Sequence, residues 1–230
     1  MKIALGFVHG IGKQKEEFHE TMAGAIRVRL SEICPEIELI SEGIYWADIT
    51  DRIEDELKEK LAPNSLHWDE HIDARGFAIS FLGDAIAYQP LPHKEGDDET
   101  NYIYNAIHLR FYEKLQELAQ CAGPNAPLCI ISHSLGTIIA SNFLYDLQNE
   151  RLPSGPLSSI SENQSSLVRG DTVTHFYTMG SPIAIWTMRY KDFGRPIAFP
   201  SPALKEAGLP YGEWVNFYEK MTLSLTLSRA

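Results

Sequence analysis

The sequence has little cysteine, little positive charge and no long apolar run. Only three of its 230 residues are cysteines, and Cys129 lies inside an apolar segment, so we expect all three to be reduced and structural. Twenty Lys and Arg against 31 Asp and Glu give a net charge of -11, which repels nucleic acid phosphates and anionic lipid headgroups. We therefore expect no nucleic-acid partner.

The apolar run of residues 1–8 is too short to cross a membrane, and no small-residue cleavage site follows it. We therefore expect neither a membrane span nor a signal peptide, and we predict a cytoplasmic protein. With 44% hydrophobic residues, the chain is long enough to bury roughly 70 to 75% of its unfolded surface in one domain. We interpret residues 1–230 as a single α/β domain, in which residues 64–100 fit a small helical cap or lid insertion.

The spacing of apolar residues predicts strands that alternate with helices along most of the chain. The expected strands are residues 3–8, 37–45, the run that begins at Leu128, 173–179 and 214–218. The expected helices are residues 18–33, 49–61, 103–118 and 135–147. This alternation predicts the α/β class, with a mostly parallel sheet covered by helices on both faces.

The segment from Leu128 to Thr137 carries the most chemical information in the chain. Its apolar run breaks at a serine between small residues and continues as an apolar-periodic segment, which predicts a strand, a sharp turn and a helix. A serine hydroxyl is a poor nucleophile, and such a turn lifts it clear of the backbone beside the free N–H groups of a helix start. Ser134 is therefore the predicted nucleophile.

The residues Ser132-His133-Ser134-Leu135-Gly136 resemble the G-x-S-x-G elbow of the α/β-hydrolase superfamily of serine esterases and lipases, with serine in place of the first glycine. The likeness extends from Phe7 to Tyr218 and implies a three-layer α/β-hydrolase-like fold. It also implies cleavage of an ester or thioester of a small-molecule acyl substrate, with no cofactor. Small side chains are needed two positions either side of the nucleophile because strand and helix backbones nearly touch there, and Ser132 is small enough.

The same resemblance implies an oxyanion hole made by the backbone N–H groups of Leu135 and Ile11. A tetrahedral intermediate carries negative charge on the former carbonyl oxygen, and each aimed donor typically contributes a few kcal/mol. A plain strand-to-helix turn is the alternative interpretation of His9-Gly10-Ile11-Gly12, but its pairing with the elbow favours the oxyanion hole. Ser181, in the run that resembles the end of the next core strand, is interpreted as a turn residue.

The acid of the triad has a positional candidate. Glu219 follows the predicted strand 214–218, where the resemblance places the family's carboxylate. A solvated glutamate at a strand end is the alternative interpretation, because that is the usual state of surface glutamate. Asp192 is a weaker candidate.

No histidine in the sequence stands where the resemblance requires the general base. His175 is the only histidine after the elbow, and it precedes Gly180 by five residues, or about 16 Å along a strand. We therefore interpret His175 as a half-buried strand residue. His133 is also interpreted as structural, because alternation along the strand turns it away from its neighbour's hydroxyl. The general base is left unassigned.

Three explanations for the missing base stay open. The carboxyl-terminal end is truncated or altered; a histidine from the cap (His67, His71 or His93) or from another subunit replaces the base; or the fold serves as a non-catalytic binding protein, a pseudoenzyme. Residues 223–227 alternate Leu with Thr and Ser, which predicts a strand. Its exposed edge predicts a homodimer formed through the carboxyl-terminal strand.

A metal site is the least favoured interpretation. His67, Glu70 and His71 fit the pattern H-x-x-E-H, which resembles the zinc motif of inverted zincin proteases. On a helix, histidines four residues apart share one face and can hold zinc while the glutamate activates water. A polar surface turn is the preferred alternative because the segment is poorly periodic. We therefore expect no metal, and a zinc metallohydrolase is kept only as a third function.

Overall fold

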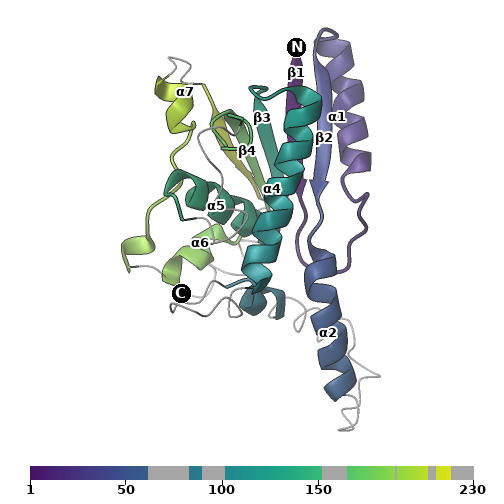
Figure 1. The fold of residues 1–230 in the computed structure, drawn as a ribbon, viewed down its shortest axis with the longest axis vertical. Coiled ribbons are helices and arrows are strands. Elements are labelled where there is room, and N and C mark those ends of the chain that lie inside the picture. The colour runs from purple at the N-terminus through teal and green to yellow at the C-terminus, as the bar shows by residue number, and fades with distance from the viewer. Residues whose placement is uncertain (62–82, 90–101, 152–164, 190, 207–210, 219–230) are drawn as a thin grey trace.

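The described residues form a five-stranded, all-parallel sheet (Figure 1). The computed structural model describes residues 1–61, 83–89, 102–151, 165–189, 191–206 and 211–218. The strand order is β2-β1-β3-β4-β5. The strands are β1 (Lys2–Val8), β2 (Glu38–Ile44), β3 (Leu128–His133), β4 (Val173–Met179) and β5 (Glu213–Phe217). All five expected strands are confirmed, with ends shifted by one or two residues at most.

Helices connect the strands and lie on both faces of the sheet, so the three-layer α/β class is confirmed. The long helices are α1 (Glu20–Ile33), α2 (Ala47–Leu61), α4 (Tyr102–Ala122) and α5 (Leu135–Gln148). These four were expected from apolar periodicity. Two short helices, α6 (Ile183–Trp186) and α7 (Pro202–Glu206), were not, because four or five residues are too few to show a helical period.

One face of the sheet carries the larger core, formed with α4 and α5. Phe111 of α4 stacks on Phe143 of α5 with ring centroids 4.2 Å apart, and both side chains are fully buried. Leu115 and Leu118 of α4 and Ile130 of β3 are also fully buried in this cluster. Because this cluster buries many more apolar side chains than the cluster on the opposite face, most of the hydrophobic stabilisation of the described chain comes from this face.

A buried polar cluster interrupts that core. His108 is inaccessible to solvent and its Nε2 lies 2.9 Å from the hydroxyl of Tyr88, while Tyr104 donates to Oδ2 of Asp146 at 2.5 Å. Burial lowers the pKa of His108 to about 3 and raises the pKa of Asp146 to about 6. His108 Nδ1 lies 3.6 Å from Asp146, but the imidazole is neutral at pH 7, so the contact is not an ion pair.

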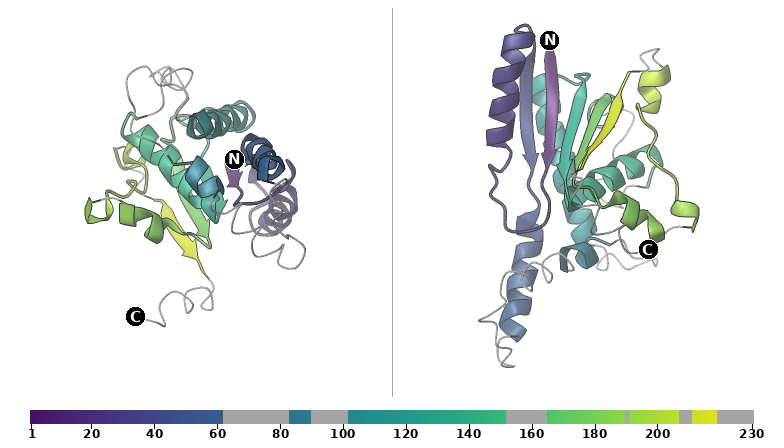
Figure 2. Two further views of the ribbon diagram at one scale, coloured as in Figure 1. Left: turned by 90° about the horizontal axis from the view of Figure 1, so that it is seen from below. Right: turned by 180° about the vertical axis from the view of Figure 1, so that it is seen from behind.

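The opposite face carries a smaller core under α1. Leu5 and Phe7 of β1 and Leu39 of β2 pack against Ala23 of α1. Seen from behind, no described helix lies over β4 and β5 on this face (Figure 2, right), and Phe217 is 54% exposed. The two sides of the sheet are therefore covered unequally by the described residues.

Several expectations concern residues outside the described part of the chain. These are most of the cap at 64–100, of which residues 83–87 are helical, the alternating tail at 223–227 and Glu219. No helix among the described residues has both the length and the apolar character that a membrane span requires. All three cysteines are free, and burial raises the pKa of the Cys129 thiol to about 12, which makes it unreactive.

Candidate active site at the carboxyl edge of the sheet

Ser134 occupies a strained turn between β3 and α5, as its sequence context predicts. Its φ of 50° and ψ of -124° match the first central position of a type II′ turn, which usually requires glycine. Ser134 follows the last residue of β3, its N–H still donates to Met179 O of the neighbouring strand at 2.9 Å, and α5 begins at the next residue. A non-glycine residue in such a conformation costs about 1 to 3 kcal/mol and persists only where the surroundings enforce it.

Two glycines bring the loop after β1 against this turn. A Cβ on Gly136 would overlap His9 O and lie 2.7 Å from Val8 O, so α5 starts in backbone contact with the end of β1. A Cβ on Gly10 would lie 2.8 Å from the Cβ of Ser134. Real side chains essentially never pack so closely. The glycine loop that sequence analysis places beside Ser134 is therefore beside it.

Ser132 takes the place of the first glycine of the elbow without conflict. Its side chain is buried, and its hydroxyl donates to Tyr177 O on the neighbouring strand at 3.2 Å. This hydrogen bond satisfies a polar group that would otherwise be costly to bury. The departure from G-x-S-x-G therefore does not disturb the turn.

The N–H groups of Leu135 and Ile11 have no hydrogen-bond acceptor among the described residues. The Ser134 carbonyl accepts from Thr137 N at 3.0 Å and from Thr137 Oγ1 at 2.7 Å. In a planar trans peptide the following N–H points the opposite way, so the Leu135 N–H points out of the start of α5. This is the orientation that an oxyanion donor at a helix start needs.

The Gly10 carbonyl is held in a similar way, by the ring of His9. His9 Nδ1 lies 2.7 Å from Gly10 O, and His9 Nε2 accepts from Trp46 N at 3.1 Å. Since Nε2 accepts, Nδ1 carries the proton and donates to Gly10 O. The N–H of Ile11 then points away from the His9 ring. Each proposed oxyanion donor thus belongs to a peptide group that is fixed through its carbonyl oxygen.

His9 itself has no capacity left for proton transfer. Its ring stacks on Trp46 at 4.7 Å between centroids, and Trp46 Nε1 donates to His9 O at 3.0 Å. Burial lowers the pKa of His9 to about 4, so the imidazole is neutral at pH 7. With both ring nitrogens occupied, His9 positions the loop after β1.

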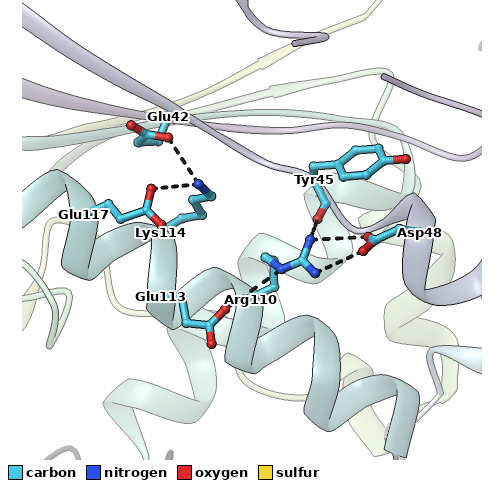
Figure 3. Close-up of polar contacts among 7 residues, drawn as sticks. All are labelled: Glu42, Tyr45, Asp48, Arg110, Glu113, Lys114 and Glu117. Atoms are coloured by element: carbon cyan, nitrogen blue, oxygen red, sulfur yellow. Dashed lines mark hydrogen bonds and ion pairs between the residues drawn. The ribbon is translucent and has the colours of Figure 1, made fainter. Parts of the chain in front are cut away.

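Arg110 of α4 binds the corner between β2 and α2, which includes Trp46; Figure 3 shows its contacts with Tyr45 and Asp48. Arg110 donates to Tyr45 O at 2.6 Å and forms a two-pronged contact with Asp48, at 3.3 and 3.0 Å. The next cation of the helix makes two further ion pairs with carboxylates of β2 and α4, Lys114–Glu42 and Lys114–Glu117. These ion pairs are partly exposed, so each contributes little to the free energy of unfolding. Their main effect is to position α4 against β2 and the corner that follows it.

Ser181 lies at the end of β4 and has the turn role expected of it. Its hydroxyl lies 2.8 Å from Thr137 Oγ1 and accepts from Ile183 N at 3.3 Å. Because Thr137 donates its own proton to the Ser134 carbonyl, Ser181 is the donor to Thr137. Ser181 therefore supports the elbow.

No histidine in the described residues makes a hydrogen bond with the Ser134 hydroxyl. His175 is a half-buried residue of β4, paired with Cys129 five residues before the nucleophile, as expected. The ring of His133 lies between Gly10 and Gly180, with its Nδ1 2.9 Å from where a Gly10 Cβ would lie. Three other histidines, His67, His71 and His93, lie in parts of the chain that are not described.

Of the acid and metal candidates, only Asp192 lies among the described residues. Asp192 is exposed on a turn with a φ of 54°, and Glu219 lies beyond the described residues. His67, Glu70 and His71 also lie outside them, and the described part of the chain holds no group of three potential metal ligands. The sequence-based hypotheses about acid, base and metal thus stay untested.

Sequence reasoning missed the contribution of Trp46 and treated His9 only as a neighbour of the glycines. The two residues lie 37 positions apart, and nothing local links them.

Comparison with family models, curated proteins and solved structures finds no match to this chain.

Proposed function

We propose that this chain is a serine hydrolase of the α/β-hydrolase type that cleaves a small-molecule carboxylic ester or thioester without a cofactor. The strained backbone at Ser134, enforced by the contacts of Gly10 and Gly136, is the observation that supports it most. Such strain clusters at functional sites, because a purely structural turn would gain stability from glycine. The two unoccupied N–H groups of Leu135 and Ile11 beside it add the donors that acyl transfer needs.

In the proposed reaction, the Ser134 oxygen bonds to the carbonyl carbon and its proton passes to a base. The Leu135 and Ile11 N–H groups donate to the oxygen that becomes negative, and each such donor is typically worth about 10²- to 10³-fold in rate. Collapse of the intermediate releases the alcohol or thiol, which takes up the proton. Water then bonds to the acyl carbon and gives a proton to the base, the carboxylic acid leaves, and the base returns the proton to the Ser134 oxygen.

The proposed base and acid come from outside the described residues. Because no described histidine contacts the Ser134 hydroxyl, we propose that His67, His71 or His93, or a histidine of a second subunit, accepts the proton. Glu219 is the proposed acid. Replacing each of these three histidines by Gln in turn, with His175→Gln as the matched control, would identify the base by the loss of esterase activity. If all three variants stay active, the base comes from elsewhere.

A fluorophosphonate probe tests the central claim. We expect covalent labelling, located to Ser134 by peptide mapping, and no labelling in Ser134→Ala. Ser31→Ala, at an exposed serine of α1, is the matched control and should be labelled like the wild type. A folded wild-type protein that is not labelled would contradict the proposal, whereas slow hydrolysis alone would not support an intact triad, since an oxyanion hole by itself accelerates hydrolysis about 10³- to 10⁴-fold.

A non-catalytic binding protein is the second candidate, favoured by the absence of an imidazole contact to Ser134 among the described residues. Unlabelled protein that still binds ester analogues would establish it. The third candidate, a zinc metallohydrolase using His67, Glu70 and His71, requires stoichiometric zinc in the purified protein. Metal analysis that finds none would remove this candidate.

Two further properties are part of the proposal. A homodimer would form through residues 223–227, which follow β5, an edge strand of the described sheet; only monomer in gel filtration at micromolar concentration would contradict it. A cytoplasmic location is proposed because the three cysteines are free thiols, as in reducing compartments. Recovery of the protein in a secreted fraction would contradict this location.

A further inference from the structure

A cavity of about 160 Å³ opens beside the candidate nucleophile, on the α1 side of β1 and β3. Its apolar walls come from β1, the start of α1, β3 and β4. They are formed by Phe7, Phe18, Met22, Ile131 and Met179. The volume is close to that of an engineered cavity in another protein, about 150 Å³, that binds benzene. The space therefore suits one aromatic ring or a short branched alkyl chain.

The polar part of the cavity is made without acidic side chains and without Lys or Arg. Gln14, His19 and His133 contribute polar atoms. In a chain with 31 acidic residues, a lining without a carboxylate favours a neutral ligand. A charged ligand group would lose its hydration there and find no partner.

The cavity and the candidate site share walls. Gly10 and His133 both line the cavity, and a Cβ on Gly10 would be 2.8 Å from the Cβ of Ser134. Ser132, two residues before the nucleophile, also lines it. Ser134 itself is not in the lining, so a molecule held in this cavity would lie against the residues that contact Ser134.

We infer that this cavity is the subsite for a small, neutral, apolar group of the substrate, about the size of a phenyl ring. That the ligand is a substrate rests on the proposed hydrolase function, whereas its size and neutrality are inferred from the cavity alone. Larger groups, such as long acyl chains, exceed the space. The group belongs either to the acyl side or to the alcohol side of the ester, and two substrate series separate these sources.

Met22 gives a variant that blocks the cavity. It lies on α1 and is 43% exposed, so Met22→Trp adds bulk at the mouth without overfilling a closed core. Val28→Trp, on the same helix and 63% exposed, adds the same side chain away from the cavity and is the matched control. Met22→Ala, which enlarges the mouth, is a second variant should Met22→Trp fold poorly.

Binding is measured first, with benzyl alcohol as a neutral probe and saturation-transfer NMR on the full chain. We expect binding to the wild type and to Val28→Trp, and at least about tenfold weaker binding to Met22→Trp, since hydrophobic pocket contacts of this size are worth about 10- to 200-fold. Equal binding to Met22→Trp, or no binding to the wild type, would overturn the inference. This measurement does not require an active serine, so it can succeed even if probe labelling of Ser134 fails.

Hydrolysis is measured second, with two ester series. One varies the acyl group from acetyl to phenylacetyl to decanoyl on a constant alcohol, and the other varies the alcohol on a constant acetyl group. We expect the phenyl-sized member of one series to have the highest kcat/KM, reduced about tenfold or more in Met22→Trp and unchanged in Val28→Trp. A decanoyl ester that is preferred, or a preference that Met22→Trp leaves intact, would overturn the inference while Ser134 labelling still upheld the hydrolase.

Discussion

On one face of the sheet, α4 and α5 bury Phe111, Phe143 and Leu115 completely; on the other face, α1 buries Ala23 and leaves Met22 43% exposed. The cavity beside Ser134 lies on the second face. Close packing and ligand space exclude one another, because a filled core has few voids larger than a water molecule. The face with the larger core therefore holds α5 and the turn before it in place. The face with the smaller core leaves room for the cavity.

The contact between α5 and β1 predicts the largest difference between the two faces. Gly136→Ala places a Cβ into His9 O and Val8 O, so we expect a loss of more than about 4 kcal/mol in the free energy of unfolding, or no folding. Gly24→Ala, inside α1, meets no atom within 4 Å and should gain about 0.5 to 1 kcal/mol. Urea denaturation measures both. Equal effects at the two glycines would contradict the close contact at Gly136.

Apolar truncation compares the cores directly. Phe111→Ala removes a fully buried ring from its stack on Phe143 and should cost about 3 to 5 kcal/mol. Ile26→Ala, at a partly buried position of α1, should cost about 1 to 2 kcal/mol because less apolar area leaves water there on folding. Urea midpoints at pH 7 give both values. If Ile26→Ala costs as much as Phe111→Ala, the smaller core contributes as much free energy of unfolding per side chain as the larger one.

Local patterns predicted the turn, and long-range contacts explain what they missed. The spacing around Ser134 defines strand, turn and helix within ten residues, and the glycines needed for close approach are visible in the sequence. His9 and Trp46 meet across 37 positions, and Tyr104 and Asp146 across 42. Apolar periodicity shows which face of an element is buried but not which residue it meets, so these partners could not be predicted.

The two faces meet at His9, which stacks on Trp46 of the larger core and contacts Phe18 of the smaller one. Its pKa falls from 6.5 to about 4 on folding, so the folded state favours the neutral ring. The neutral ring therefore contributes about 3 kcal/mol to the free energy of unfolding. This contribution is complete above pH 6.5 and is lost as the pH falls through about 4. Protonation at Nε2 would also break the hydrogen bond from Trp46 N–H, while Nδ1 would go on donating to Gly10 O.

We therefore expect the fluorophosphonate labelling of Ser134 and the urea midpoint to fall together between pH 6.5 and 4. His9→Gln should lower both at pH 7.5 and flatten their dependence on pH. His175→Gln, at a half-buried histidine of β4 away from this edge, is the matched variant and should keep the wild-type profile. A His9→Gln profile as steep as that of the wild type would assign the acid transition to other groups, His108 first among them.

The larger core contains a group, Asp146, whose titration on folding has the opposite sign. Burial raises the pKa of Asp146 from 3.8 to about 6, so the folded state keeps a proton that the unfolded state has lost. Its contribution is complete below pH 3.8 and disappears as the pH rises through about 6, about 2 to 3 kcal/mol in all. Asp146→Asn keeps an acceptor for Tyr104 and removes the charge, so we expect its stability relative to wild type to rise by that amount from pH 4 to pH 8. The control is Asp55→Asn on α2, which removes an exposed ion pair with Lys13 and should change the free energy of unfolding little at either pH. If the free energies of unfolding of Asp146→Asn and wild type differ by the same amount at both pH values, Asp146 is ionised throughout this range. The larger core would then contain enough hydrogen-bond donors to stabilise a buried carboxylate.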